Sequence, residues 1–273
     1  MGIDSTKPNG RRTQVGRRHP LASVALILAG LVATGGAYAL FTSTATAETA
    51  SSEVVHQQLV DEGEALFAAN CSSCHGMNGE GTEEGVSLFG VGAAAVDFQV
   101  GTGRMPMAAQ GPQAEKKPVQ FSDEQILALA TYVADFAPGP EIPNEELLDG
   151  SDADLANGGV LFRINCAMCH NVAGAGGALT EGKFAPSLQG VSSKHIYEAM
   201  VTGPQNMPVF NDLNLTPEDK ADVIAYLKFL EETPSVGGFT LGSLGPVSEG
   251  LFIWIFGLGA VVGVTVWIAA RAN

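Results

Sequence analysis

Two uninterrupted apolar runs stand near the ends of the chain, and a mostly polar stretch with short amphipathic segments lies between them. Residues 21–41 carry no charged side chain, and neither do residues 251–270. A helix needs about 20 apolar residues to cross a bilayer. The pattern therefore predicts one transmembrane helix near each end of this sequence, with a polar region between them.

Within the polar region, two amphipathic helices are predicted from start signals followed by apolar residues at helical spacing. Ser122 with Gln125 forms a capping-box pattern, and Thr216 is followed by Pro217 and two acidic residues. The apolar positions of the two helices are Leu129, Ala130, Val133 and Phe136, and Val223, Ile224, Leu227 and Leu230. These helices close the two halves of an internal repeat.

The repeat begins well upstream of these helices. Residues 63–70 read GEALFAAN and residues 158–165 read GGVLFRIN, so that Gly, Leu, Phe and Asn coincide. Further along, residues 102–107 read TGRMPM and residues 202–208 read TGPQNMP, and each segment offers a Met-Pro pair. Self-similarity of this kind predicts two units of the same design in tandem.

A CxxCH sequence follows each upstream segment directly, CSSCH at residues 71–75 and CAMCH at residues 166–170. CxxCH is the attachment signature of a c-type haem. Two thiols three positions apart can form thioether bonds to the two vinyl groups of one porphyrin, and the adjacent imidazole then reaches the iron. We therefore predict two covalently bound haem c groups, attached through Cys71, Cys74, Cys166 and Cys169.

The iron ligands are predicted from the same repeat. His75 and His170 should each give one imidazole nitrogen, and the Met loops should supply the sixth ligands, Met105 and Met207. We prefer Met105 to Met107 because it precedes a proline, as Met207 does. A Met/His pair raises the reduction potential of the haem. It also closes the iron to outside molecules, which favours electron transfer over oxygen or peroxide chemistry.

Other uses of the cysteines and histidines are less well supported. Two CxxC pairs could form one zinc site if they met in space, and a redox-active CxxC would need a βαβ context that this sequence lacks. The trailing histidines and the Met loops favour haem. The remaining histidines, His19, His56 and His195, are expected to be solvated or hydrogen-bonded on the surface rather than to bind iron.

Charge indicates how the chain is oriented. Basic residues precede the first apolar run and end the second, so the positive-inside rule places both tails in the cytoplasm; they are Arg11, Arg12, Arg17, Arg18 and Arg271. The polar region would then lie outside, where haem is attached in bacteria. A cleaved signal peptide is the alternative for the first run, because residues 45–47 read ATA. Signal h-regions usually have about 7–15 residues, so we favour a retained anchor.

The chain holds 14 basic and 29 acidic side chains, for a formal net charge of −15. The acidic excess lies in the polar region between the apolar runs. This balance excludes nucleic acid as a partner, because a nucleic-acid surface is basic. An acidic surface could instead steer a basic redox partner.

Residues 185–190, APSLQG, resemble the Pro-x-Leu-x-Gly element of class I cytochromes c. In that family the proline carbonyl accepts a hydrogen bond from the haem histidine, which implies that Pro186 orients His170. In the first unit Val86 stands where proline is expected, and its carbonyl could accept the same bond.

We therefore predict an all-α protein of two tandem class I cytochrome c domains with an N-terminal and a C-terminal transmembrane helix. The predicted parts are a basic cytoplasmic tail (1–20), an anchor (21–41), a linker (42–57), a first domain (58–137), a linker (138–154), a second domain (155–232), a linker (233–250) and a transmembrane helix (251–270).

This order of parts is similar to the dihaem cytochrome c subunit, or cytochrome cc, of the actinobacterial cytochrome bc1 complex. The most specific segments are TGRMP at 102–106, TGPQNMP at 202–208, GAGGAL at 174–179, and the tail around Gly245, Pro246 and Trp254. The resemblance implies a subunit of a menaquinol-oxidising respiratory complex in the cell membrane. Its implied partners are cytochrome b, a Rieske iron–sulfur subunit, an aa3-type oxidase and membrane lipid.

In such a complex the chain would pass electrons from the Rieske centre to the oxidase through its two haems, with no catalysis by the isolated subunit. One alternative is an electron-transfer subunit of another terminal oxidase of the cbb3 type, although those usually lack a C-terminal span such as residues 251–270. The other alternative is a dihaem peroxidase, but no residue has the pattern of a peroxide acid or base.

Overall fold

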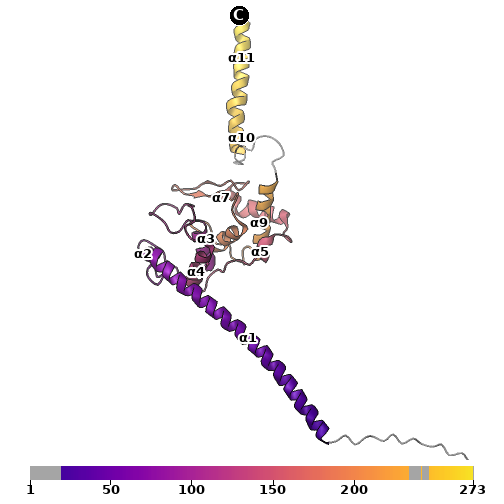
Figure 1. Ribbon diagram of the computed structural model, residues 1–273. Helices are drawn as coiled ribbons and strands as arrows, with labels where there is room; N and C mark the ends of the chain where they lie inside the picture. The colour runs from indigo at the N-terminus through magenta and orange to yellow at the C-terminus, as the bar shows by residue number, and fades with distance from the viewer. Residues whose placement is uncertain (1–19, 234–240, 242–245, 273) are drawn as a thin grey trace, which may run out of the picture. The chain divides into compact units, whose positions relative to one another are not determined.

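The computed structural model describes residues 20–233, 241 and 246–272, and it is mostly helical (Figure 1). The helices are α1 (Pro20–Asn70), α2 (Ser72–His75), α3 (Gly92–Gly101), α4 (Asp123–Ala134), α5 (Glu146–Asp149), α6 (Leu155–Asn165), α7 (Ala167–His170), α8 (Ser193–Thr202), α9 (Pro217–Glu232), α10 (Pro246–Phe252), the π-helix η2 (Ile253–Leu258) and α11 (Gly259–Arg271). One antiparallel pair of two-residue strands, β1 (Gly177–Ala178) and β2 (Phe184–Ala185), accompanies them. The predicted all-α class is confirmed.

The chain divides into two compact parts, residues 1–56 and 57–273. Within residues 1–56, Leu21–Leu40 of α1 is an apolar stretch long enough to cross a membrane, and none of it is buried. The hydroxyl of Thr34 donates to the carbonyl oxygen of Gly30 at 2.7 Å, so this polar group is satisfied within the helix. Helix α1 also includes residues 42–57, so the segment expected as a linker is helical. The predicted basic tail, apart from Pro20, lies outside the described residues.

Residues 57–273 end in another helix that can span a membrane, Val247–Arg271, and none of its apolar stretch is buried. Near its end, the guanidinium of Arg271 lies 4.7 Å from the ring centre of Trp267. Tryptophan and arginine are common where membrane helices meet water. Two candidate membrane helices are therefore present, while most of the predicted linker 233–250 lies outside the described residues.

The first core lies between the last turns of α1 and helices α3 and α4. Its buried residues are Phe67, Val100, Ile126, Leu129 and Val133. Gly63 lets α1 approach α4 closely, because a Cβ atom at this position would lie 2.2 Å from the carbonyl oxygen of Ala128. The glycine of the first repeat therefore sets the distance between two helix backbones.

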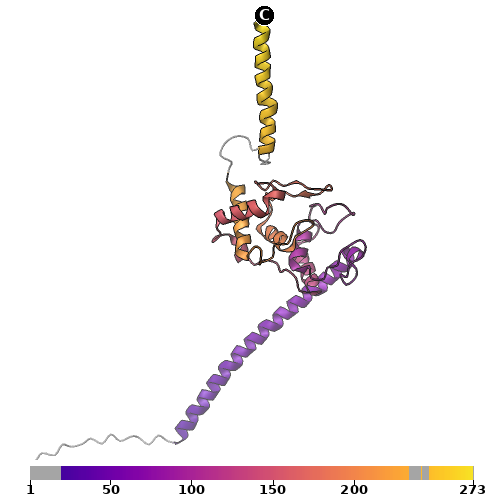
Figure 2. The ribbon, with the colours of Figure 1, turned by 180° about the vertical axis from the view of Figure 1, so that it is seen from behind.

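The second core repeats this design with α6 crossing α9 and α8 packed alongside. Figure 1 shows α9 beside α5, and the orange α9 can be followed from behind in Figure 2. The buried residues are Phe162, Ile196, Tyr197, Met200, Leu215, Val223, Ile224 and Leu227. A Cβ atom on Gly158 would lie 2.0 Å from the carbonyl oxygen of Asp222. Gly63 and Gly158 thus have the same role in the two halves of the repeat, because each lets two helix backbones pack closely.

Both predicted helix starts are confirmed as capping boxes. The amide of Gln125 donates to Ser122 Oγ at 3.4 Å, and the amide of Asp219 donates to Thr216 Oγ1 at 3.2 Å. The amides of Ser122 and Thr216 donate in return to the side chains of Gln125 and Asp219. A cap of this kind stabilises a helix by about 1 kcal/mol.

Candidate haem sites

The second CxxCH segment lines a cavity of about 820 Å³. Cys166 is the residue at which α6 ends, and α7 then carries Cys169 and His170 to the cavity wall. Pro186 follows β2, and Met207 lies in the loop after α8; both line the same cavity. The structure therefore places all five residues that were predicted for the second haem around one space.

His170 is held in one orientation by its neighbour. Its Nδ1 lies 2.9 Å from the carbonyl oxygen of Pro186, which can only accept, so Nδ1 donates. Burial lowers the pKa of His170, although the bond to Pro186 opposes this effect. The neutral imidazole then has its lone pair on Nε2, as an iron ligand requires. The residues around this cavity fit a haem c.

The first CxxCH segment has the same arrangement around its histidine. His75 Nδ1 lies 2.7 Å from the carbonyl oxygen of Val86, so valine occupies the place that proline has in the second unit. Cys71 and Met105 both pack against the first core, while Met107 is not among the residues packed there. The first cytochrome domain thus has a thiol and a thioether packed against its core and an imidazole oriented by a backbone carbonyl.

Backbone bonds hold both Met loops. The amide of Met105 donates to the carbonyl oxygen of Gln99 at 2.9 Å, and the amide of Met207 donates to that of Pro204 at 3.0 Å. Gly203 has φ 59°, and a Cβ atom on it would lie 2.9 Å from the carbonyl oxygen of Met207. The backbone of each methionine is therefore tied to the segment before it, and for Met207 this bond closes a tight turn.

The four cysteines are all free and stay in two separate pairs. Burial, followed by the neighbouring thiol, raises the pKa of Cys71 and of Cys166 to about 11, so both are neutral near pH 7. In the described part of the chain, no group of three or more candidate metal ligands contains a cysteine. The zinc alternative, which needs the pairs to meet as thiolates, is not supported.

Residues of the first domain line the cavity of the second. Arg104, the neighbour of Met105, lines the cavity that contains His170, and its guanidinium lies 4.8 Å from the ring centre of Phe98. Gln113 and Ala114 line it as well. The sequence predicted a ligand role for Met105 in this segment, but it gave no role to Gln113 or Ala114, which belong to no motif. The contact brings the loop of the first methionine to the wall of the second cavity.

One of the other histidines differs from its predicted place. His195, expected on a solvated or hydrogen-bonded helix surface, has a side chain only 19% exposed and lies 3.7 Å from the carboxylate of Asp97. Helix α8 turns this residue toward α3 of the first domain. His56 is on the exposed part of α1, and His19 lies outside the described residues.

Two helical units, each with a CxxCH turn, an oriented histidine and a Met loop, define a c-type cytochrome with two domains. The family described as "Cytochrome C oxidase, cbb3-type, subunit III" matches residues 58–133 and 153–227, one match in each unit.

The chain is 44% identical over 272 residues to a "Cytochrome bc1 complex cytochrome c subunit" of Corynebacterium efficiens, covering 94% of this chain and 92% of that protein. A subunit of the same description from Mycobacterium tuberculosis is 44% identical over 269 residues, covering 96% and 95%. The similarity to a "Cbb3-type cytochrome c oxidase subunit CcoP" of Helicobacter pylori is weaker, 27% over 193 residues, covering 64% and 61%. The chain belongs to the family of cytochrome bc1 complex cytochrome c subunits, and membership implies covalently bound haem c.

Proposed function

We propose that this chain is the dihaem electron carrier of a menaquinol-oxidising cytochrome bc1 complex. It takes electrons from a Rieske iron–sulfur subunit and passes them through its two domains to an aa3-type oxidase. The observation that carries the proposal is that the loop after Met105 lines the second cavity. This contact supports two haem sites in neighbouring positions within one folded part of the chain.

The proposed attachment residues are Cys71 and Cys74 for the first haem and Cys166 and Cys169 for the second, and the proposed iron ligands are His75 with Met105 and His170 with Met207. Haem c, when bound, supplies an iron that exchanges one electron, and a Met/His pair raises its potential. The protein groups orient the imidazoles through the carbonyls of Val86 and Pro186 and surround the second site with apolar side chains. Such a site suits electron exchange and leaves no open position for a substrate.

The membrane topology is part of the proposal. Both termini would lie in the cytoplasm, with the two cytochrome domains, about residues 58–137 and 155–232, on the outer face of the cell membrane. Two membrane helices hold the carrier beside its donor and acceptor. Tethering of this kind raises the effective concentration of the partners, so a mobile cytochrome c is not needed.

Two alternatives are weaker. A subunit of a cbb3-type oxidase would share the cytochrome domains, but the similarity to that class covers less of the chain, and the C-terminal span favours the bc1 assignment. A dihaem peroxidase needs an open iron, whereas both units offer a methionine held by a backbone bond.

The test is to purify the chain from its native membranes in a mild detergent, using a tag other than polyhistidine. We expect cytochrome b, a Rieske protein and an aa3-type oxidase in the same particle, and reduction of the c haems by a menaquinol. A particle without cytochrome b and Rieske subunits would contradict the proposal. A variant without residues 246–273 is the control for the second anchor, and it should yield less oxidase per cytochrome b.

A further inference from the structure

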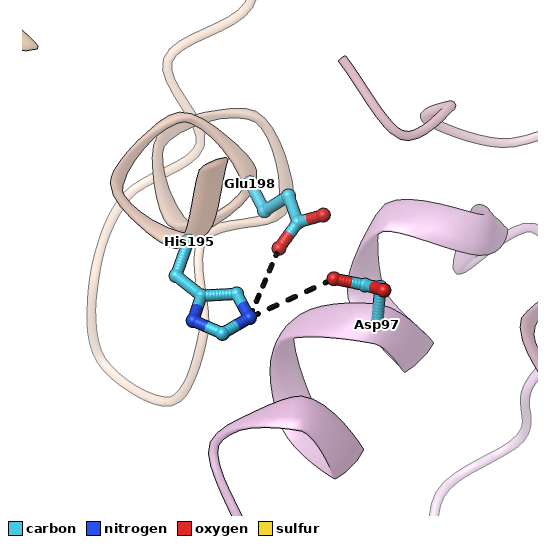
Figure 3. A group of neighbouring side chains, drawn as sticks. All are labelled: Asp97, His195 and Glu198. Carbon is cyan, nitrogen blue, oxygen red and sulfur yellow. Dashed lines mark ion pairs between the residues drawn. The ribbon is translucent and has the colours of Figure 1, made fainter. Parts of the chain in front are cut away.

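Three ionisable side chains meet where the first domain contacts the second (Figure 3). Asp97 comes from α3, while His195 and Glu198 come from α8. His195 Nε2 lies 3.7 Å from Asp97 Oδ2 and 4.0 Å from Glu198 Oε2. Because His195 and Glu198 are three positions apart on one helix, they share the face that is turned toward α3. Neither haem site, as proposed above, uses these residues.

Glu198 is the unusual member of this group. Its side chain is 0% exposed, and neither of its carboxylate oxygens has a hydrogen-bond partner among the described residues. The side chain of Asp97 is only 8% exposed. A buried carboxylate without a partner is costly and must take up a proton or pair with a cation. One of these oxygens, Glu198 Oε2, is directed toward His195 Nε2 (Figure 3).

We propose that Asp97, His195 and Glu198 bind one divalent transition-metal cation, of the zinc class, between the two domains. Their ligand atoms lie within 4.8 Å of one another. Bonds of about 2.0–2.2 Å to nitrogen and carboxylate oxygen bring neighbouring ligand atoms to within roughly 3.5 Å, so small side-chain rotations complete the site. One imidazole and two carboxylates also suit the harder cation Mn²⁺.

A bound dication would neutralise the two carboxylates more fully than the existing Lys194–Asp97 ion pair does. Lys194 Nζ lies 2.7 Å from Asp97 Oδ2 and neutralises one carboxylate. Burial, followed by the charge of Asp97, raises the pKa of Glu198 to about 9, so one ammonium does not keep both carboxylates ionised. The Lys194 side chain is 40% exposed and can swing into water when a cation binds Asp97.

The neighbours of His195 hold its ring in place for this role. The ring of Phe98 lies edge-on to the imidazole, with the ring centres 6.1 Å apart. A Cβ atom on Gly101 would approach Nε2 to 3.1 Å, so the small residue leaves room there. His195 also lines the cavity that contains His170 and Met207. A cation at this point would fix one wall of the second cavity against the first domain.

The experiment measures metals in the intact chain within its membrane complex, with a tag other than polyhistidine, and counts metal per chain by protein quantification. We expect one equivalent of zinc or manganese per chain, counted apart from the copper of the oxidase. After treatment with a chelator, added ZnCl2 should restore one equivalent. Glu198→Gln and His195→Gln should each weaken zinc binding at least 10-fold, while Glu181→Gln, at an exposed acidic position, should leave it unchanged.

A fourth variant separates the cation from a simple charge network. Lys194→Gln removes the competing ammonium, so it should bind zinc as tightly as the wild type or more tightly. The proposal is overturned if the chelated wild type takes up no zinc equivalent, or if Glu198→Gln binds zinc like the wild type. Haem absorption serves as the folding check. If Glu198→Gln does not fold by this check, the metal contents of the wild type and of Lys194→Gln test the proposal. A wild type without metal would overturn it and would mean that Glu198 carries a proton instead.

Discussion

The side-chain amide of Gln113 and the backbone of Phe184 exchange two hydrogen bonds, each 2.9 Å long. Gln113 belongs to the first cytochrome domain and Phe184 to β2 of the second. The amide of Ala114 adds a third bond, 3.3 Å long, to the side chain of Gln205 in the second Met loop. These bonds fix the loop that lines the second cavity, and they connect the first domain to the second.

Replacing Gln113 with alanine should loosen the attachment of this loop to the second domain. Two hydrogen bonds at about 0.5–1.5 kcal/mol each correspond to roughly a 5- to 150-fold increase in local opening. Hydrogen exchange should therefore quicken at the amide of Phe184 by a factor in that range. Gln110→Ala is the matched control, because Gln110 bonds to Glu84 inside the first domain. Equal increases in the exchange rate of the Phe184 amide in both variants would contradict the role of Gln113 in fixing this loop.

Replacing the predicted methionine ligands should lower the haem potentials. Met105→His and Met207→His exchange a thioether for an imidazole, and each should lower one potential by a sizeable part of the roughly 0.8 V that axial ligands span. Redox titration of the c-haem absorption measures this shift. Met107→His should leave both potentials near their wild-type values. A shift with Met107→His but not with Met105→His would assign the first haem to the other methionine.

Alanine at Gly158 should destabilise the second domain, because its Cβ atom would collide with the backbone of α9. Overpacking of this kind costs about 1–3 kcal/mol. At Gly159 the closest atoms are the ring of Tyr226 at 3.0 Å and the guanidinium of Arg163 at 3.2 Å, and these side chains can move. Thermal unfolding should therefore show a larger drop in Tm for Gly158→Ala than for Gly159→Ala. The reverse order would contradict the close crossing of α6 and α9.

The stability of chelator-treated protein should fall as the pH rises. The pKa of Glu198 is raised from an ordinary 4.5 to about 9, so the folded state holds this proton more tightly than the unfolded state. Its contribution is complete below about pH 4.5 and is lost as the pH rises toward 9. The groups that face Glu198 are Asp97, Lys194 and His195.

Glu198→Gln should flatten this part of the Tm–pH profile, and so should zinc bound to the wild type, because the carboxylate is then ionised on the cation. Glu181→Gln is the control, since that exposed carboxylate should leave the profile unchanged. Identical profiles for the chelated wild type and Glu198→Gln would contradict the burial of an unpaired carboxylate.

Features that depend on neighbouring residues in the sequence could be predicted. The caps at Ser122 and Thr216, the two exposed apolar spans and the repeated units follow from local patterns, and the structure has them. The carbonyl of Val86 was predicted to be able to replace that of proline, and it lies at hydrogen-bond distance from His75. Backbone carbonyls are present at every residue, so this substitution leaves the acceptor in place.

Features that depend on packing between distant segments could not be predicted. Asp97 and His195 are 98 positions apart, and only the docking of α3 on α8 brings them together. Helix α3 contains a run of alanines without a strong start signal, which gave no reason to place Asp97 in an interface. The bonds between Gln113 and Phe184 likewise arise from a polar loop without a motif.

The most direct test of the account is the mass of the denatured chain, isolated from cells that attach haem c. Covalent attachment at both CxxCH segments predicts a polypeptide heavier by two haem groups. Replacing Cys71 and Cys74 by serine should remove one of them, and replacing Cys166 and Cys169 should remove the other. A denatured wild-type chain that carries no haem, or only one, would contradict the central claim.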